Sequence, residues 1–259
     1  MKTPQATLSV WINANPSFKR FDGPIVNYLS RHHPLAYWEY HHHQDEPSSL
    51  EIALTLLHDY LKSCSHSVNL IGHGTGGLLG LVYARRYPNQ VKSLTLLGVG
   101  SNPAVDWQAH YYYMRKFLPC SQEIVLTRMV QMMFGYQNRS NAKSLVNILQ
   151  QDLDTSPTAH SLYQQERVAP GGVSMPLMVC GSNNDGIVDR PALQRWSDYL
   201  KDGDLLWTNP LGHHFFHYFF AMSVSKQITE FWCKVNKQPT NVSLEPIDSE
   251  ETCYPFKIH

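Results

Sequence analysis

A glycine-rich turn between an apolar strand and a helix restricts the fold of this chain more than any other feature. Residues 68–71 form a short apolar run, residues 72–77 read Gly-His-Gly-Thr-Gly-Gly, and a helical pattern over residues 78–87 ends before Pro88. Glycine tolerates strained backbone turns and lets two elements approach closely, because it has no side chain. The turn therefore predicts a buried strand and a helix that pack tightly against each other.

Strand and helix patterns alternate along most of the chain. We expect strands at residues 8–12, 35–40, 68–71, 93–99, 176–180 and 205–208. We expect helices at residues 24–30, from about residue 50 to 61, and at residues 78–87, 191–200 and 221–235. Alternation of this kind is typical of a mostly parallel sheet with helices on both faces.

One long segment interrupts the alternation. Residues 103–169 contain no convincing strand, and their helical stretches are rich in methionine and aromatic residues. We therefore expect an α/β core built from residues 1–102 and 170–235, a helical cap at residues 103–169, and a peripheral tail at residues 236–259. The large apolar side chains of the cap fit plain helix packing, an apolar substrate pocket, or both.

Composition excludes several classes of protein. Lysine plus arginine and aspartate plus glutamate each number 21, and this balance argues against a nucleic-acid surface or a polybasic membrane anchor. Five widely spaced cysteines without a Cys-x-x-Cys pair argue against a disulfide framework or a zinc site. No apolar run approaches the ~20 residues of a membrane-spanning helix. With no signal peptide recognised, a cytoplasmic location is the expectation.

The glycine-rich turn resembles a known catalytic motif. In the α/β-hydrolase superfamily, a strand leads through Gly-x-Ser-x-Gly into a helix, and this nucleophile elbow lifts the serine above the sheet. Residues 72–76 match the elbow except at its centre, where Gly74 stands in place of the serine. The chain thus resembles serine-hydrolase-like proteins of the AB hydrolase-1 type from residue 8 to about residue 235. The family's leading antiparallel hairpin is expected to be absent.

Two later segments resemble the acid and base of the same family. Residues 181–188, Gly-Ser-Asn-Asn-Asp-Gly-Ile-Val, follow a strand and match the acid loop, which points to Asp185. Residues 212–217, Gly-His-His-Phe-Phe-His, match the C-terminal histidine motif in two registers, giving either His213 or His214 as the base. We favour His214, with His213 at the position where the family usually has glycine.

The resemblance also implies two oxyanion-binding amides. After its first strand the family often has His-Gly-x-Pro, whereas this chain has Asn13, Ala14, Asn15 and Pro16. By position, the backbone N–H groups of Asn15 and Thr75 would face a developing oxyanion. The side chain of Thr75 is expected to point away, so it does not replace the missing serine.

The missing hydroxyl limits the chemistry that the resemblance implies. In an intact triad the serine attacks an acyl carbon, the histidine takes its proton, and the acid orients the histidine. Loss of one member leaves only about 10³–10⁴-fold catalysis over water. We therefore expect a pocket for a small apolar ester- or acyl-type compound, with base and acid retained and weak or no hydrolysis. No cofactor and no metal is expected.

Three functional hypotheses remain open at this point. The first is a hydrolase whose position 74 should be serine, so that restoring it confers turnover. The second is a non-catalytic pseudo-hydrolase that binds a hydrophobic ligand or a protein. The third is an enzyme in which His214 and Asp185 act as a general-base pair on water or on an acidic C–H, with no covalent step.

Each motif also has a plainer interpretation. Gly72, Gly74 and Gly77 fit the dinucleotide fingerprint Gly-x-Gly-x-x-Gly, but two strands precede it and no acid ends the next strand. The run of histidines at residues 41–43 fits a solvated turn better than a metal site. Asp185 is also suited to capping a turn, and His214 to a place in the core.

Overall fold

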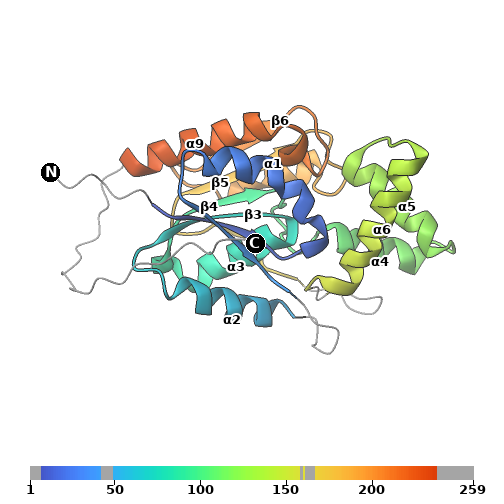
Figure 1. Cartoon of the computed structure of the whole chain (residues 1–259), viewed down its shortest axis with the longest axis horizontal. Coiled ribbons are helices and arrows are strands. Elements are labelled where there is room, and N and C mark those ends of the chain that lie inside the picture. Colours follow the sequence, from blue (N-terminus) through green and yellow to red (C-terminus); the bar gives the residue numbers. More distant parts are fainter. Residues whose placement is uncertain (1–6, 42–48, 158–159, 161–166, 238–259) are drawn as a thin grey trace.

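The computed structural model of the chain describes residues 7–41, 49–157, 160 and 167–237. In these residues, six strands form one sheet in the order β2-β1-β3-β4-β5-β6, and every neighbouring pair is parallel (Figure 1). The strands are β1 (Ser9–Asn13), β2 (Leu35–Glu39), β3 (Val68–His73), β4 (Val91–Leu97), β5 (Leu177–Ser182) and β6 (Leu205–Asn209). The predicted parallel α/β architecture is confirmed.

Helices cover both faces of this sheet. The α-helices are α1 (Lys19–Ser30), α2 (Leu50–Leu61), α3 (Gly74–Arg86), α4 (Trp107–Phe117), α5 (Gln122–Phe134), α6 (Arg139–Thr155), α7 (Arg190–Gln194), α8 (Phe216–Phe219) and α9 (Ala221–Lys237). Short 3₁₀ turns occupy Pro16–Phe18, Pro88–Gln90 and Arg195–Asp198. Figure 1 shows α1 and α9 side by side on one face, with α2 and α3 on the other. None of the described helices combines the length and hydropathy needed to cross a membrane.

Side chains of β1 alternate between two hydrophobic clusters, one on each face of the sheet. Val10 and Ile12 belong to the cluster under α2 and α3, whereas Trp11 belongs to the cluster under α1 and α9. Val179 and Cys180 of β5 divide in the same way. Successive side chains of a strand point to opposite faces, so a strand buried on both faces is apolar at successive positions.

Helix α1 begins earlier than the sequence predicted. The expected range was residues 24–30, but α1 starts at Lys19 and Pro24 lies inside it. Phe21, Ile25 and Leu29 are buried at spacings of four residues, so one apolar face continues across the proline. Pro24 interrupts the hydrogen bonding of the helix, but packing of Phe21 against Phe215, and of Ile25 and Leu29 in the cluster under α1 and α9, keeps the segment helical.

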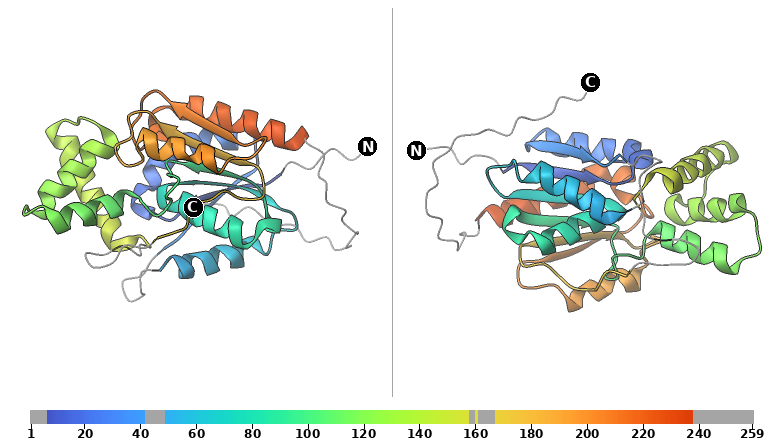
Figure 2. Two further views of the ribbon diagram at one scale, coloured as in Figure 1. Left: turned by 180° about the vertical axis from the view of Figure 1, so that it is seen from behind. Right: turned by 90° about the horizontal axis from the view of Figure 1, so that it is seen from below.

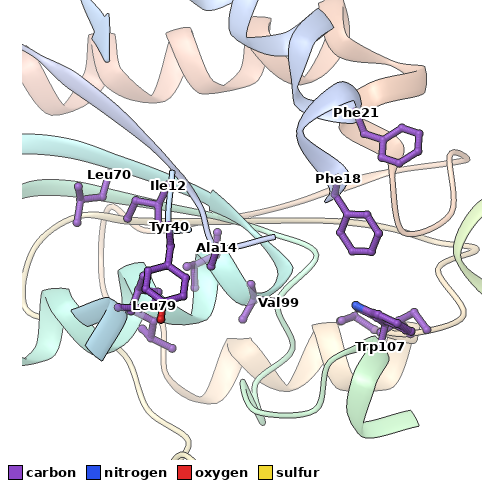
Figure 3. Packing of buried hydrophobic residues seen from close by; sticks show 14 of the residues in the cluster. Ile12, Ala14, Phe18, Phe21, Tyr40, Leu70, Leu79, Val99 and Trp107 are labelled. Carbon is purple, nitrogen blue, oxygen red and sulfur yellow. The ribbon is translucent and has the colours of Figure 1, made fainter. Parts of the chain in front are cut away.

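The segment between β4 and β5 contributes α4, α5 and α6, and its described residues contain no strand. These helices project from the sheet at one end of the molecule (Figures 1 and 2). Trp107 of α4 packs against Phe18, with ring centroids 6.0 Å apart, and Figure 3 shows the two rings between α4 and the start of α1. Packing is thus continuous from the sheet into α4. The boundaries of a cap at residues 103–169 stay a prediction.

Candidate active site

The glycine-rich turn lies at the C-terminal end of β3. β3 ends at His73 and α3 begins at Gly74, whose φ of +51° lies in the left-handed region that residues with side chains rarely adopt. A Cβ built on Gly74 has one atom within 4 Å outside its own chain neighbours and helix, namely Nε2 of His214 at 3.8 Å. Position 74 therefore faces His214 with room for a small side chain.

The glycines that flank Gly74 keep strand and helix in close contact. A Cβ on Gly72 would lie 2.5 Å from the carbonyl carbon of Gly76, and a Cβ on Gly76 would collide with the carbonyl oxygen of Ile12. Only glycine fits both positions, because real Cβ atoms do not approach other atoms so closely. The tight packing that the sequence predicted is therefore present.

His214 and Asp185 form a buried pair at the C-terminal edge of the sheet. Asp185 follows β5, His214 follows β6, and Nδ1 of His214 lies 2.9 Å from Oδ2 of Asp185. The other carboxylate oxygen of Asp185 accepts the backbone N–H groups of Ile187 at 2.7 Å and Val188 at 3.1 Å. An ionised Asp185 fixes the proton of His214 on Nδ1, which leaves Nε2 as an acceptor facing Gly74. We call Asp185 and His214 the acid–base side of the site.

His213 has a different environment from His214. Its φ of +53° is the only positive value among the described non-glycine residues, which fits the position where glycine was expected. Its backbone N–H donates to Oδ1 of Asn184 at 2.9 Å, and its Nδ1 lies 3.0 Å from the Asn184 carbonyl oxygen. The structure thus places His214, and not His213, on Asp185, although a catalytic role for either stays a prediction.

The two residues predicted to supply oxyanion amides follow the neighbouring strands β1 and β3. Asn15 follows β1, and its backbone N–H donates to Oδ1 of Asn13 at 2.7 Å. Thr75 is the second residue of α3, and its hydroxyl donates to Asp106, the N-cap of α4, at 3.4 Å. We call Asn13, Asn15, Gly74 and Thr75 the oxyanion side of the site.

A buried carboxylate ties this oxyanion side to α6. Asp152 accepts hydrogen bonds from five side chains: Asn15 at 3.1 and 3.2 Å, Ser17 at 2.7 Å, Trp107 at 3.0 Å, Gln108 at 3.2 Å and Ser156 at 2.5 Å. Burial raises the pKa of Asp152, and the hydrogen bonds from these donors oppose that rise. Asp152 was missed in the sequence. Its signal was an acid in helical register with the buried Leu145 and Leu149.

A second buried His–Asp pair lies behind the first. Nε2 of His217 is 3.3 Å from Oδ1 of Asp22, and the His73 ring stands between His217 and His214 with centroid separations of 4.3 and 4.6 Å. Nε2 of His73 donates to the His214 carbonyl oxygen at 3.0 Å, which supports the His214 loop. Burial lowers the pKa of both His73 and His217, so both rings are held neutral near pH 7.

Metal-binding chemistry finds no support in the part of the chain that the structure describes. Those residues contain no group of three or more histidine, cysteine, aspartate or glutamate side chains arranged to hold an ion. Of the three consecutive histidines, His41 lies 3.1 Å from Glu39, and residues 42–43 lie outside the described residues.

Comparison with known proteins finds the same fold and a family profile that matches part of this chain. Residues 63–125 match the sequence profile of the family described as alpha/beta hydrolase fold. A meta-cleavage product hydrolase from Pseudomonas fluorescens aligns over 90% of this chain and 92% of its own, with a TM-score of 0.65 and 11% identity. An enol-lactonase from Burkholderia xenovorans aligns over 90% and 94%, with a TM-score of 0.63 and 16% identity.

The chain has the α/β-hydrolase fold, and its residues 63–125 match the profile of that family. Two cyanobacterial relatives share most of its length. The uncharacterized protein alr2406 of Nostoc sp. is 46% identical over 90% of this chain and 94% of its own. The uncharacterized protein sll0249 of Synechocystis sp. is 38% identical over 93% and 96%. In this α/β-hydrolase fold, the predicted base and acid meet, and the glycine at position 74 faces His214.

Proposed function

We propose that this α/β-hydrolase binds a small apolar ester- or acyl-type compound between Gly74 and His214, and that it hydrolyses such compounds weakly or not at all. One observation carries the proposal: His214 is held on Asp185 while its Nε2 faces a position that lacks a side chain. The base and its orienting acid are retained, and the attacking hydroxyl is missing.

Apolar surroundings support this class of ligand. Phe215 follows His214 directly and stacks on Phe134 of α5, with ring centroids 4.6 Å apart. The backbone N–H of His214 donates to the Met133 carbonyl oxygen at 3.1 Å, so α5 contacts the base loop directly. We propose on this ground that residues 103–169 act as a cap over the site. A cytoplasmic location also stays a prediction.

A second candidate function is a non-covalent reaction in which His214 activates water. The described residues offer Nε2 of His214 no hydrogen-bond partner, and glycine at position 74 leaves the volume of about one hydroxymethyl group beside it. A water held there would give its proton to Nε2 as its oxygen attacks an acyl carbon. Without a covalent intermediate, this reaction is expected to be slow.

The proposal is tested by restoring the hydroxyl. In Gly74→Ser, the serine Oγ is expected to bond to the acyl carbon of p-nitrophenyl acetate while its proton passes to Nε2 of His214 and p-nitrophenolate leaves. Water then releases acetate from the serine. We expect at least a tenfold gain in p-nitrophenolate release over the unmodified protein, and Gly74→Ser/His214→Ala should abolish it.

The unmodified protein separates the two candidates. A thermal-shift screen of short-chain esters is expected to find compounds that raise the melting temperature and that are recovered intact after incubation. Hydrolysis that the unmodified protein catalyses and His214→Ala loses supports the water mechanism instead. Hydrolysis unchanged in His214→Ala contradicts both, since each assigns the base to His214.

A further inference from the structure

The backbone amide of Asn15 already has an acceptor inside the protein. Its N–H donates to Oδ1 of Asn13 at 2.7 Å, and Asn13 is buried at the end of β1. In the arrangement that the site otherwise follows, this N–H must be free to bind the oxygen that becomes negative during acyl transfer. A short, buried hydrogen bond to a carboxamide oxygen competes directly with that oxygen.

An acceptor on one side and a donor on the other fix the direction of the Asn13 carboxamide. Nδ2 of Asn13 donates to the hydroxyl of Tyr37 at 2.6 Å, and that hydroxyl donates to Oδ2 of Asp22 at 2.9 Å. The indole N–H of Trp11 donates to the same oxygen at 2.9 Å. A flipped carboxamide would place its NH₂ against the N–H of Asn15, two donors facing each other, so Oδ1 stays on the amide.

Asn15 is held from its other side as well. Its side-chain NH₂ donates to both oxygens of Asp152 and, at 3.0 Å, to the hydroxyl of Ser156. The backbone of Asn15 is therefore fixed between β1 and α6, and the peptide cannot turn toward a ligand without breaking buried hydrogen bonds. Such losses are costly in a buried network.

We propose that Oδ1 of Asn13 accepts the hydrogen bond of the Asn15 N–H in place of a substrate's carbonyl oxygen. This N–H therefore cannot act as an oxyanion donor, whichever residue stands at position 74. The inference rests on the proposed function and deepens it. The site then differs from an active hydrolase at two points, and a serine alone restores only one of them. Asn13 acts through Asn15, so it is a positioning residue.

The test is a cycle of four proteins: the unmodified chain, Gly74→Ser, Asn13→Ala and the double variant. We measure p-nitrophenyl acetate turnover and the rate of labelling by a fluorophosphonate. Asn13→Ala should raise the kcat of Gly74→Ser by about 10²-fold, the usual effect of one oxyanion donor, and leave KM within about threefold. The cycle compares this gain with the effect of Asn13→Ala in the unmodified chain.

Two matched variants in the Gly74→Ser background control for structural effects. Asn13→Asp keeps an acceptor oxygen on the Asn15 amide, so it should give no gain. Asn69→Ala removes another buried asparagine of the sheet, bonded to Ser9 and Ser93 away from Asn15, and should also give none. A gain in either variant overturns the inference, because it would not depend on freeing the amide.

The outcomes distinguish this inference from the function on which it rests. Labelling of Gly74→Ser with no gain from a folded Asn13→Ala overturns the role of Asn13 alone. Absence of labelling in both serine variants overturns the proposed function. If Asn13→Ala does not fold, deuterium exchange at the Asn15 amide of the unmodified protein decides: strong protection is expected, and exchange at the rate of an open loop contradicts the inference.

Discussion

The acid–base side and the oxyanion side of the site differ in what their hydrogen bonds do. On the acid–base side, backbone amides hold Asp185, Asp185 holds His214, and Nε2 of His214 is left directed at Gly74. On the oxyanion side, the Asn15 amide is bonded to Asn13 and the Thr75 hydroxyl to Asp106. The acid–base side presents an available acceptor, Nε2 of His214. On the oxyanion side, the Asn15 amide and the Thr75 hydroxyl are already hydrogen-bonded within the protein.

Under the proposed function, this difference indicates which parts of a catalytic site a fold retains without its serine. The His214–Asp185 pair is buried and joined by a hydrogen bond, and breaking it would leave uncompensated polar groups. An oxyanion amide has no such constraint, because another side chain can satisfy it. The stability of the fold is therefore sufficient reason to keep the His214–Asp185 pair. An Asn15 amide without an internal acceptor is needed only for catalysis.

The largest expected effect concerns the acid–base side. In the most active serine variant, Asp185→Asn should lower the rate of ester hydrolysis by about 10³-fold. The NH₂ of asparagine would donate to Nδ1 of His214, which moves the histidine proton to Nε2 and removes the acceptor for the serine. Steady-state kinetics measure the loss, and an unchanged rate would mean that Asp185 only caps its loop.

The next largest effect concerns the oxyanion side. Asp152→Ala should lower the free energy of unfolding by about 3 kcal/mol, because four buried donors and the partly buried Ser17 hydroxyl lose their acceptor. Asp152→Asn keeps one carbonyl acceptor and the shape of the side chain, so its loss should be about 1 kcal/mol. Urea unfolding measures both, and equal losses would contradict this account, because the acceptor and the side-chain shape kept in Asp152→Asn would then contribute nothing.

A smaller effect should appear when the pH falls. His73 and His217 have lowered pKa values in the folded protein because both are buried. As the pH falls through about 6.5, the histidines of the unfolded chain take up protons while the two folded rings stay neutral. The contribution of these rings to the free energy of unfolding is therefore complete above pH 6.5. Below it, the free energy of unfolding should fall by about 1.4 kcal/mol per pH unit for each ring.

Variants isolate this contribution. Asp152 has a raised pKa, so its protonation in the folded protein increases the free energy of unfolding as the pH falls. For this reason the slopes of the free energy of unfolding against pH are compared between variants. His217→Phe should reduce the fall between pH 6.5 and 5.5, measured by urea unfolding. His66→Gln, at an exposed position, should leave it unchanged. Identical slopes in all three proteins would contradict the neutral state of His217.

The smallest effect concerns the choice between the two adjacent histidines. His213→Gly removes contacts with Asn184 but relieves the strain of a φ of +53°, so stability should change by less than about 1 kcal/mol. Its ester-hydrolysis rate in the Gly74→Ser background should be unaffected. A loss as large as that of His214→Ala would move the base to His213.

Local patterns in the sequence predicted the parts of the structure that depend on neighbouring residues. The strand, the turn and helix α3 follow from the glycines at residues 72–77, and the pairing of Asp185 with His214 follows from short motifs after β5 and β6. The sequence prediction started α1 too late, at Pro24, because a proline is typical of the first turn of a helix. The apolar spacing on both sides of Pro24 was given less weight. Packing of Phe21 and Ile25 decided the outcome.

Contacts between residues far apart in the chain could not be predicted from the sequence. The partners of Asp152 include Asn15, 137 residues away, and those of His217 include Asp22, 195 residues away. No local pattern joins such positions. The sequence marked Asn13 as a departure from the family motif, yet only the structure showed its oxygen on the Asn15 amide.

The most direct test of the acid–base side is mass spectrometry of Gly74→Ser after treatment with a fluorophosphonate. If His214 and Asp185 are poised as the structure places them, the new serine should carry one phosphonyl group, and Gly74→Ser/His214→Ala should carry none. Labelling that is equal in the two variants, or absent from a folded Gly74→Ser even with Asn13→Ala, would contradict a retained acid–base pair.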